Sequence, residues 1–172
     1  TVSCSMHGTI RDPKCWSPEH PDLYGMETWY ETTDEDGKKI SYLADKQKVG
    51  IRVAEFDADR GFFLNGVPMK IKGVCVHHDA GCLGAAVTKE VWHRRFAKLK
   101  ECGCNAIRCS HNPHMPELYE LCDTMGFLVM DEAFDYWYRM KSPNSPYNRY
   151  FMQAFKVDTA AMVQDAYNHP SV

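Results

Sequence analysis

The feature that most constrains the fold of this chain is a unit that repeats after Gly66, in which a short apolar strand is followed by an amphipathic helix. The predicted strands lie at residues 69–76, 105–108 and 127–130, and the predicted helices begin near Thr88, Pro116 and Phe151. Strands that alternate with helices build a parallel sheet with right-handed crossovers. A closed eightfold barrel of such units needs about 250 residues. Only 106 residues follow Gly66, so if the fold is a barrel, this chain holds less than half of it.

Local signals mark the ends of the predicted helices. Thr88 suits an N-cap, and Gly103 stands where a C-terminal glycine ends a helix. Pro116 suits a first helical turn, because its missing N–H is not needed there, and Gly126 closes the same helix. These signals predict one helix up to residue 101 and a second up to residue 125.

The first sixty residues predict strands and turns, without a helix of useful length. The predicted hairpins pair residues 27–33 with 38–43 around Asp34-Glu-Asp-Gly37, and residues 62–64 with 67–71 around Asn65-Gly66. Alternating apolar residues predict a further half-buried strand over residues 49–56. We therefore expect part of a β-sandwich over residues 1–60 and a change of architecture near Gly61.

Composition and charge exclude several classes of partner. The 172 residues include 20 basic and 23 acidic side chains, a net charge of −3, and no basic block. We therefore expect neither nucleic acid nor a membrane as a partner. The apolar runs are too short for a transmembrane span. The eight cysteines show no zinc-ribbon spacing, and several lie in apolar runs, which predicts buried, reduced thiols.

Polar side chains follow each of the three predicted parallel strands. They are His77-His-Asp79 after the first strand, Arg108-Cys-Ser-His-Asn112 after the second, and Asp131-Glu132 with Asp135 and Trp137 after the third. Ligands of strand–helix folds bind at the carboxyl ends of the strands. The sequence therefore predicts a polar pocket at this edge of the sheet.

A metal site is one hypothesis for this pocket. Adjacent His77 and His78 point to opposite faces of a strand, so they cannot bind one ion together. A metal-dependent hydrolase would instead use His77, Asp79 and His111. The alternative for His78 is a purely structural role, on the helix side of the sheet or in a loop, with a hydrogen bond to one ring nitrogen.

A second hypothesis is that Asp131 and Glu132 form a catalytic pair, because paired carboxylates can act as general acid and base. Adjacent carboxylates on a strand diverge, however. We therefore interpret one of them as the partner of Arg108 in a charge-assisted hydrogen bond, and the other as facing the helices. Arg108 could orient a carboxylate nucleophile or bind a hydroxylated ligand, and His111 and Asn112 add hydrogen-bonding groups for sugar hydroxyls.

Six ordered motifs resemble the family 2 glycoside hydrolases, which include β-galactosidases and β-glucuronidases. They are Gly61-Phe-Phe-Leu-Asn-Gly66, Lys72-Gly-Val-Cys-Val-His-His-Asp79, Asn105-Ala-Ile-Arg-Cys-Ser-His-Asn-Pro113, Leu121-Cys-Asp-Thr-Met-Gly126, Met130-Asp-Glu-Ala133 and Asn168-His-Pro-Ser-Val172. The resemblance implies the C-terminal part of an immunoglobulin-like β-sandwich at residues 1–60. It also implies the first three strand–helix units of a TIM barrel at residues 61–172.

The resemblance further implies a retaining glycosidase with two catalytic carboxylates about 5 Å apart. Both would lie beyond Val172, so no catalytic residue is expected in the chain, and we predict that these 172 residues alone hydrolyse no glycoside. The implied substrate is a terminal β-linked sugar, with β-galactosides first. The alternative is a non-catalytic carbohydrate-binding or pseudoenzyme fragment.

The resemblance also implies roles for individual residues. His77 and His111 would contact sugar hydroxyls or the transition state, and Arg108 would position the nucleophile. Together with Asn112, Asp135 and Trp137 they form the expected substrate-binding set. No metal or other cofactor is expected, since Asp135 and Trp137 stand where some relatives bind magnesium through a glutamate and a histidine. A homo-oligomeric parent is compatible with the resemblance, and the cellular location stays open.

Overall fold

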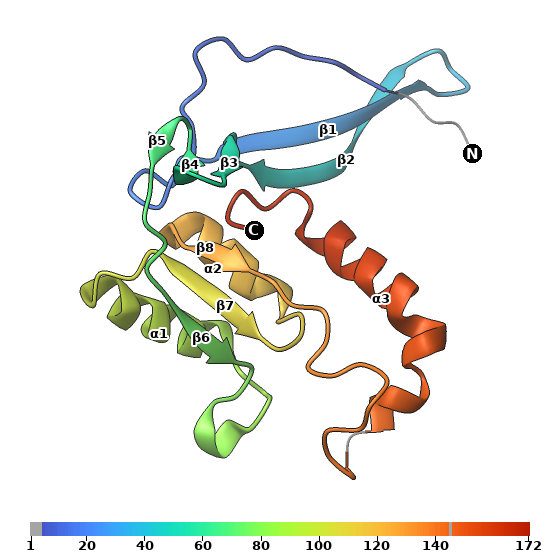
Figure 1. Cartoon of the computed structure of the whole chain (residues 1–172). Coiled ribbons are helices and arrows are strands. Elements are labelled where there is room, and N and C mark those ends of the chain that lie inside the picture. The colour runs from blue at the N-terminus through green and yellow to red at the C-terminus, as the bar shows by residue number, and fades with distance from the viewer. Residues whose placement is uncertain (1–4, 145) are drawn as a thin grey trace.

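The structure of the chain, a computed structural model, describes residues 5–144 and 146–172. Its strands are β1 (Tyr24–Thr33), β2 (Lys39–Val49), β3 (Ala54–Asp57), β4 (Gly61–Leu64), β5 (Val67–Pro68), β6 (Gly73–His77), β7 (Ala106–Ser110) and β8 (Leu128–Met130). Its helices are α1 (Lys89–Glu101), α2 (Pro116–Met125) and α3 (Phe151–Ala166), with short 3₁₀ turns η1 (Gly81–Leu83) and η2 (Pro146–Arg149). Figure 1 shows their arrangement.

A parallel sheet in the order β6-β7-β8 forms the centre of the C-terminal part, and it is open rather than closed into a barrel. Helices α1 and α2 cover one face of this sheet, where alternate strand residues pack against them (Figure 1). Trp92 and Phe96 of α1, Ile107 of β7 and Leu118 of α2 are almost completely buried in this core. The amphipathic pattern therefore placed the apolar stripes of both helices correctly.

The ends of α1 and α2 follow the local signals closely. Thr88 precedes α1 as the N-cap residue, although its side chain makes no capping hydrogen bond. Pro116 is the first residue of α2, and Gly126 ends that helix in the left-handed conformation with a φ of 72°. A Cβ atom at Gly126 would lie 2.3 Å from the carbonyl oxygen of Pro18, so glycine is required here for space as well as for backbone conformation.

Helix α3 differs from the other two, because it does not join the layer that α1 and α2 form. It runs from the loop after β8 toward the end of β2 (Figure 1). Asn168, just beyond it, donates a hydrogen bond to the side chain of Gln47 at 3.1 Å. Within α3 only Phe151 and Ala166 are buried.

The N-terminal part begins with a long antiparallel hairpin of β1 and β2, whose pairing shifts by one residue between Thr28 and Trp29. The strand predicted over residues 49–56 is confirmed only at its ends and is wrong over residues 50–53, because β2 ends at Val49 and β3 begins at Ala54. Tertiary contacts hold the intervening residues out of a sheet. The Trp16 N–H donates to the Ile51 carbonyl, and Arg52 donates to the Val172 carbonyl.

Strands β3, β4 and β5 form a small antiparallel sheet next to the amino-terminal ends of the parallel strands, above them in Figure 1. The predicted Asn65-Gly66 turn joins β4 and β5, and both residues have positive φ angles of 54° and 76°. Trp16 and Leu64 form a second buried cluster with Ala106 and Leu128 of the parallel sheet. The Trp16 indole also donates a 2.8 Å hydrogen bond to the Asp123 carbonyl of α2.

Two described cysteines, Cys109 and Cys75, lie in the parallel sheet and face opposite sides of it. Cys109 and Cys122 are buried and reduced, as predicted. Cys75 is also reduced but exposed, because its position in β6 places it on the face that the helices do not cover. Cys4 lies outside the described residues.

Candidate functional site

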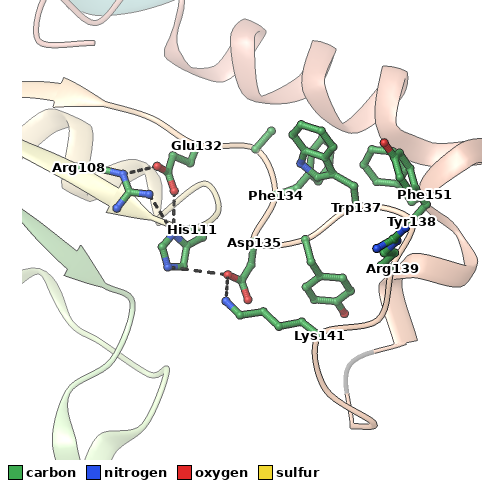
Figure 2. A pocket seen from close by; sticks show the side chains of 12 residues that line it. Arg108, His111, Glu132, Phe134, Asp135, Trp137, Tyr138, Arg139, Lys141 and Phe151 are labelled. Carbon is green, nitrogen blue, oxygen red and sulfur yellow. Dashed lines mark hydrogen bonds and ion pairs between the residues drawn. The ribbon is translucent and has the colours of Figure 1, made fainter.

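An ion-paired cluster lies at the carboxyl ends of β7 and β8 (Figure 2). The guanidinium Nε of Arg108 in β7 donates to Oε1 of Glu132, two residues beyond β8. The other oxygen of Glu132 lies 2.9 Å from Nδ1 of His111. Burial alone would raise the pKa of Glu132, but the hydrogen bonds from His111 and Arg108 outweigh it and hold this pKa below its ordinary value. Glu132 is therefore ionised at neutral pH.

The ionised state of Glu132 determines the tautomer of His111. An ionised carboxylate only accepts hydrogen bonds, so we assign the proton to Nδ1 of His111. In the neutral imidazole, Nε2 is then an acceptor. It points toward Asp135, whose Oδ1 lies 3.8 Å away and also pairs with Lys141 (Figure 2). On the side away from Glu132, Nε2 of His111 therefore faces the pocket with the carboxylate of Asp135 beside it.

These side chains line a pocket of about 910 Å³ that also has an aromatic wall. The wall consists of Phe134, Trp137, Tyr138 and Phe151 (Figure 2). The rings of Trp137 and Phe151 stack at 6.5 Å with an interplanar angle of 14°. Trp137 is 57% exposed, so a large part of its surface is available to a ligand.

His77 and Asn112 line a neighbouring cleft of about 730 Å³, which shares His111, Asp135 and Lys141 with the first pocket. The ring of His77 meets that of His111 edge to face at 5.3 Å. Asn112 donates a 3.2 Å hydrogen bond to the adjacent Pro113 carbonyl. The structure therefore brings Arg108, His111, Asp135 and Trp137 to one pocket and places the other two predicted residues beside it.

Asp131 and Glu132 diverge, which confirms our interpretation of this pair. Asp131 faces the helical layer, where its Oδ2 accepts a 2.8 Å hydrogen bond from the Tyr119 hydroxyl of α2. Burial raises the pKa of Asp131 above its ordinary value. The two neighbouring carboxyl groups therefore have opposite pKa shifts, and only Glu132 belongs to the pocket.

His77 and His78 also point in opposite directions, as predicted. The His78 ring packs near Trp92 of α1, with centroids 6.0 Å apart, on the helix side of the sheet. The expected hydrogen bond to its ring nitrogen is not confirmed, since Nδ1 of His78 is buried without a partner among the described residues.

The described residues contain no group of three or more His, Cys, Asp or Glu side chains placed to hold a metal ion. Asp79, part of the hypothetical metal set, lies 3.7 Å from the guanidinium of Arg95 instead. Within the same described ranges, no helix has the length and apolar character to span a membrane.

Sequence reasoning missed Lys141 and the aromatic side chain of Phe151 as pocket residues. Lys141 lies in an irregular loop, where no periodicity predicts a direction. Phe151 was expected only near the start of a helix; it begins α3, where its largely buried ring also lines the pocket. The ion pair of Lys141 with Asp135, six residues earlier, therefore could not be predicted from the sequence and is given by the structure.

Comparisons with known proteins agree with this architecture. The family model of the TIM barrel domain of the glycosyl hydrolases family 2 matches residues 57–172. A β-galactosidase of Bacteroides ovatus, BoGH2A, is 46% identical over 95% of this chain and 19% of its own length. A β-glycosidase structure from Bacteroides vulgatus matches with a TM-score of 0.82 and 41% identity, covering 95% of this chain and 20% of the other. A Bacteroides uniformis β-glucuronidase structure matches with a TM-score of 0.74 and 35% identity, covering 92% and 18%.

The chain thus spans about a fifth of the length of these relatives. Their names include both a β-galactosidase and a β-glucuronidase, so similarity alone does not assign one sugar.

Proposed function

Because the chain belongs to the family 2 glycosyl hydrolases, we propose that it supplies part of the sugar-binding pocket of a retaining glycosidase that cleaves terminal β-linked sugars. Such an enzyme uses two carboxyl groups about 5 Å apart, one as nucleophile and one as acid/base. We place both in a part of the protein that follows these 172 residues. The chain itself would then bind and orient the sugar without hydrolysing it.

The observation that carries this proposal is the cluster of Arg108, Glu132 and His111 beside an aromatic wall. Pockets for small ligands combine apolar surface with a few fixed polar groups. Nε2 of His111 and the carboxylate of Asp135 would accept hydrogen bonds from sugar hydroxyls, and Trp137 would pack on an apolar sugar face. Arg108 would place a positive charge close to the catalytic nucleophile.

We propose β-galactosides as the substrate class. Arg108 and Lys141 already pair with Glu132 and Asp135, which leaves their charges neutralised and favours an uncharged sugar. The 46% identity to a β-galactosidase supports the same choice. A β-glucuronide is the second candidate, because Arg139 also lines the pocket and could pair with a sugar carboxylate.

The architecture around this pocket is part of the same proposal. Residues 1–60 would belong to an immunoglobulin-like β-sandwich, and residues 61–172 would form the first three strand–helix units of the barrel. The β3–β4 hairpin has one strand on each side of this division, so it would connect the two parts. The position of α3 outside the layer of α1 and α2 would then change once further barrel helices pack against it.

The test compares kcat/KM for p-nitrophenyl β-galactoside and p-nitrophenyl β-glucuronide in a protein that carries this segment together with the later carboxylates. We expect the galactoside to be preferred, and the 172 residues alone to show no turnover. Preference for the glucuronide, abolished by Arg139→Gln, would support the second candidate instead. Saturable sugar binding by the longer protein without turnover would establish the non-catalytic alternative.

A further inference from the structure

Cys75 occupies an unexpected position beside the guanidinium group of the pocket. Strands β6 and β7 run parallel, and their register places Cys75 directly opposite Arg108. Side chains at paired positions project from the same face of a sheet. Nη1 of Arg108 donates a hydrogen bond to the Cys75 sulfur at 3.2 Å, and its distance to the Ser110 hydroxyl is a longer 3.4 Å.

Three acceptors hold this guanidinium group: Glu132 at Nε, and Cys75 and the more distant Ser110 at Nη1. The third nitrogen, Nη2, lies 3.3 Å from Nδ1 of His111, which carries a proton in the tautomer assigned above and therefore does not accept from it. A planar guanidinium group that is bound on two edges cannot rotate about its own axis.

We propose that Cys75 is a positioning residue, whose sulfur fixes the plane of the Arg108 guanidinium group against Glu132 and His111. Its relevance to catalysis rests on the function proposed above. Without the sulfur, Nη1 would keep only its longer hydrogen bond to Ser110, and the guanidinium plane would be held less firmly against Glu132. The sugar-facing geometry of His111, which shares Glu132 with Arg108, would then loosen as well.

Comparison with Cys109 shows how its neighbours change the pKa of the Cys75 thiol. Cys109 neighbours Arg108 in the chain but faces the helices, where burial strongly raises the pKa of its thiol. Hydrogen bonds from Arg108 and Ser110 instead lower the pKa of the Cys75 thiol, against the opposing charge of Glu132. Cys82 and Cys102 are exposed and provide comparison thiols within the same chain.

The first experiment measures the contact without using glycosidase activity. Iodoacetamide alkylates thiolates: the sulfur forms a bond to carbon and iodide leaves, after the thiol has lost its proton to solvent. Mass spectrometry of the 172-residue chain gives the alkylation rate of each cysteine as a function of pH. We expect the profile of Cys75 to lie at lower pH than those of Cys82 and Cys102, and Arg108→Gln to move it toward theirs.

Cys109 serves as the folding control, since it stays protected only while α1 and α2 cover the sheet. A Cys75 profile that Arg108→Gln leaves unchanged, with Cys109 still protected, would overturn the proposal.

The second experiment measures the consequence for the pocket, in the longer protein with its proposed activity. Cys75→Ala should lower kcat/KM about tenfold, the size expected for a lost hydrogen bond to a charged group. Cys75→Ser, which keeps an acceptor, should recover most of it, and Cys102→Ala should change nothing. Full activity in Cys75→Ala would refute the positioning role while the proposed function stands. If the unmodified protein shows no turnover, the proposed function fails, and the alkylation profile still decides whether Arg108 contacts Cys75.

Discussion

The two faces of the parallel sheet have opposite characters, although they share the same three strands. Toward α1 and α2, Ile107, Cys109 and Val129 are buried among apolar helix residues. On the other face, Arg108 and Cys75 lie side by side and lead to the pocket. The alternation of a β-strand separates these sets by a single residue, so one strand can stabilise the fold with one face and bind a ligand with the other. Substitutions on the two faces should therefore affect different measurements.

The largest effect is expected in the helix-covered core. Phe96 is fully buried between Trp92 and Phe127, so Phe96→Ala should reduce the free energy of unfolding by about 3–5 kcal/mol. Denaturant unfolding of the chain measures this loss. Phe56 is 80% exposed, and Phe56→Ala is the matched control, for which we expect a much smaller change. Equal losses for both variants would contradict the proposed core.

Ile107 and Arg108 test the comparison within a single strand. Ile107→Ala should cost about 2–5 kcal/mol of stability, because Ile107 is buried against the helices. Arg108→Gln should lower the stability much less, since its ion pair with Glu132 is partly exposed, but should lower kcat/KM of the longer protein about tenfold or more. Urea unfolding and steady-state kinetics separate the two effects. The comparison fails if Arg108→Gln destabilises the chain as strongly as Ile107→Ala.

The two neighbouring carboxyl groups, one on each face of the sheet, should change the free energy of unfolding in opposite directions as the pH falls. The pKa of Glu132 lies below its ordinary value of 4.5, so its stabilising contribution is present above that value and is lost as the pH falls through the depressed pKa. The pKa of Asp131 lies above its ordinary value of 3.8, so its contribution is present below that value and is lost as the pH rises through the raised pKa. Glu132→Gln should therefore flatten the acid loss of stability, and Asp131→Asn should steepen it. Unfolding free energies measured from about pH 3 to 7 compare the variants, and a shift in the same direction for both would contradict the assignment.

The smallest effect is expected at the aromatic wall. Trp137→Ala removes an exposed ring that packs on Phe151, so stability should change by less than about 1 kcal/mol. Sugar affinity of the longer protein should fall roughly threefold to tenfold if the ring contacts the ligand. Exposed Trp29, far from the pocket in β1, provides the control. The control variant is Trp29→Ala, and calorimetric titration with a galactoside measures both affinities. Equal affinities of Trp137→Ala and Trp29→Ala would show that the aromatic wall does not contact the sugar.

Much of the fold followed from local patterns. The helix periodicity and the glycines at helix ends predicted α1 and α2 to within a residue or two, and Asn65-Gly66 predicted its hairpin. The strand predicted over residues 49–56 was wrong over residues 50–53, because alternation alone does not reveal a competing contact. Arg52 lies next to Val172, a residue 120 positions away in the chain, and no short window contains that information.

For the candidate site, the sequence determined which residues follow which strand, and the period of two determined that Asp131 and Glu132 diverge. These properties depend on neighbouring residues, so they can be deduced from the order of the chain. The tertiary structure decided which partners those side chains meet. Arg108 pairs with Glu132 and contacts Cys75 because the parallel register of β6, β7 and β8 brings residues 24 and 33 positions apart together, and Lys141 reaches Asp135 through an irregular loop. Register and loop path depend on the packing of the whole chain, and for that reason the charge balance of the pocket could not be deduced from sequence alone.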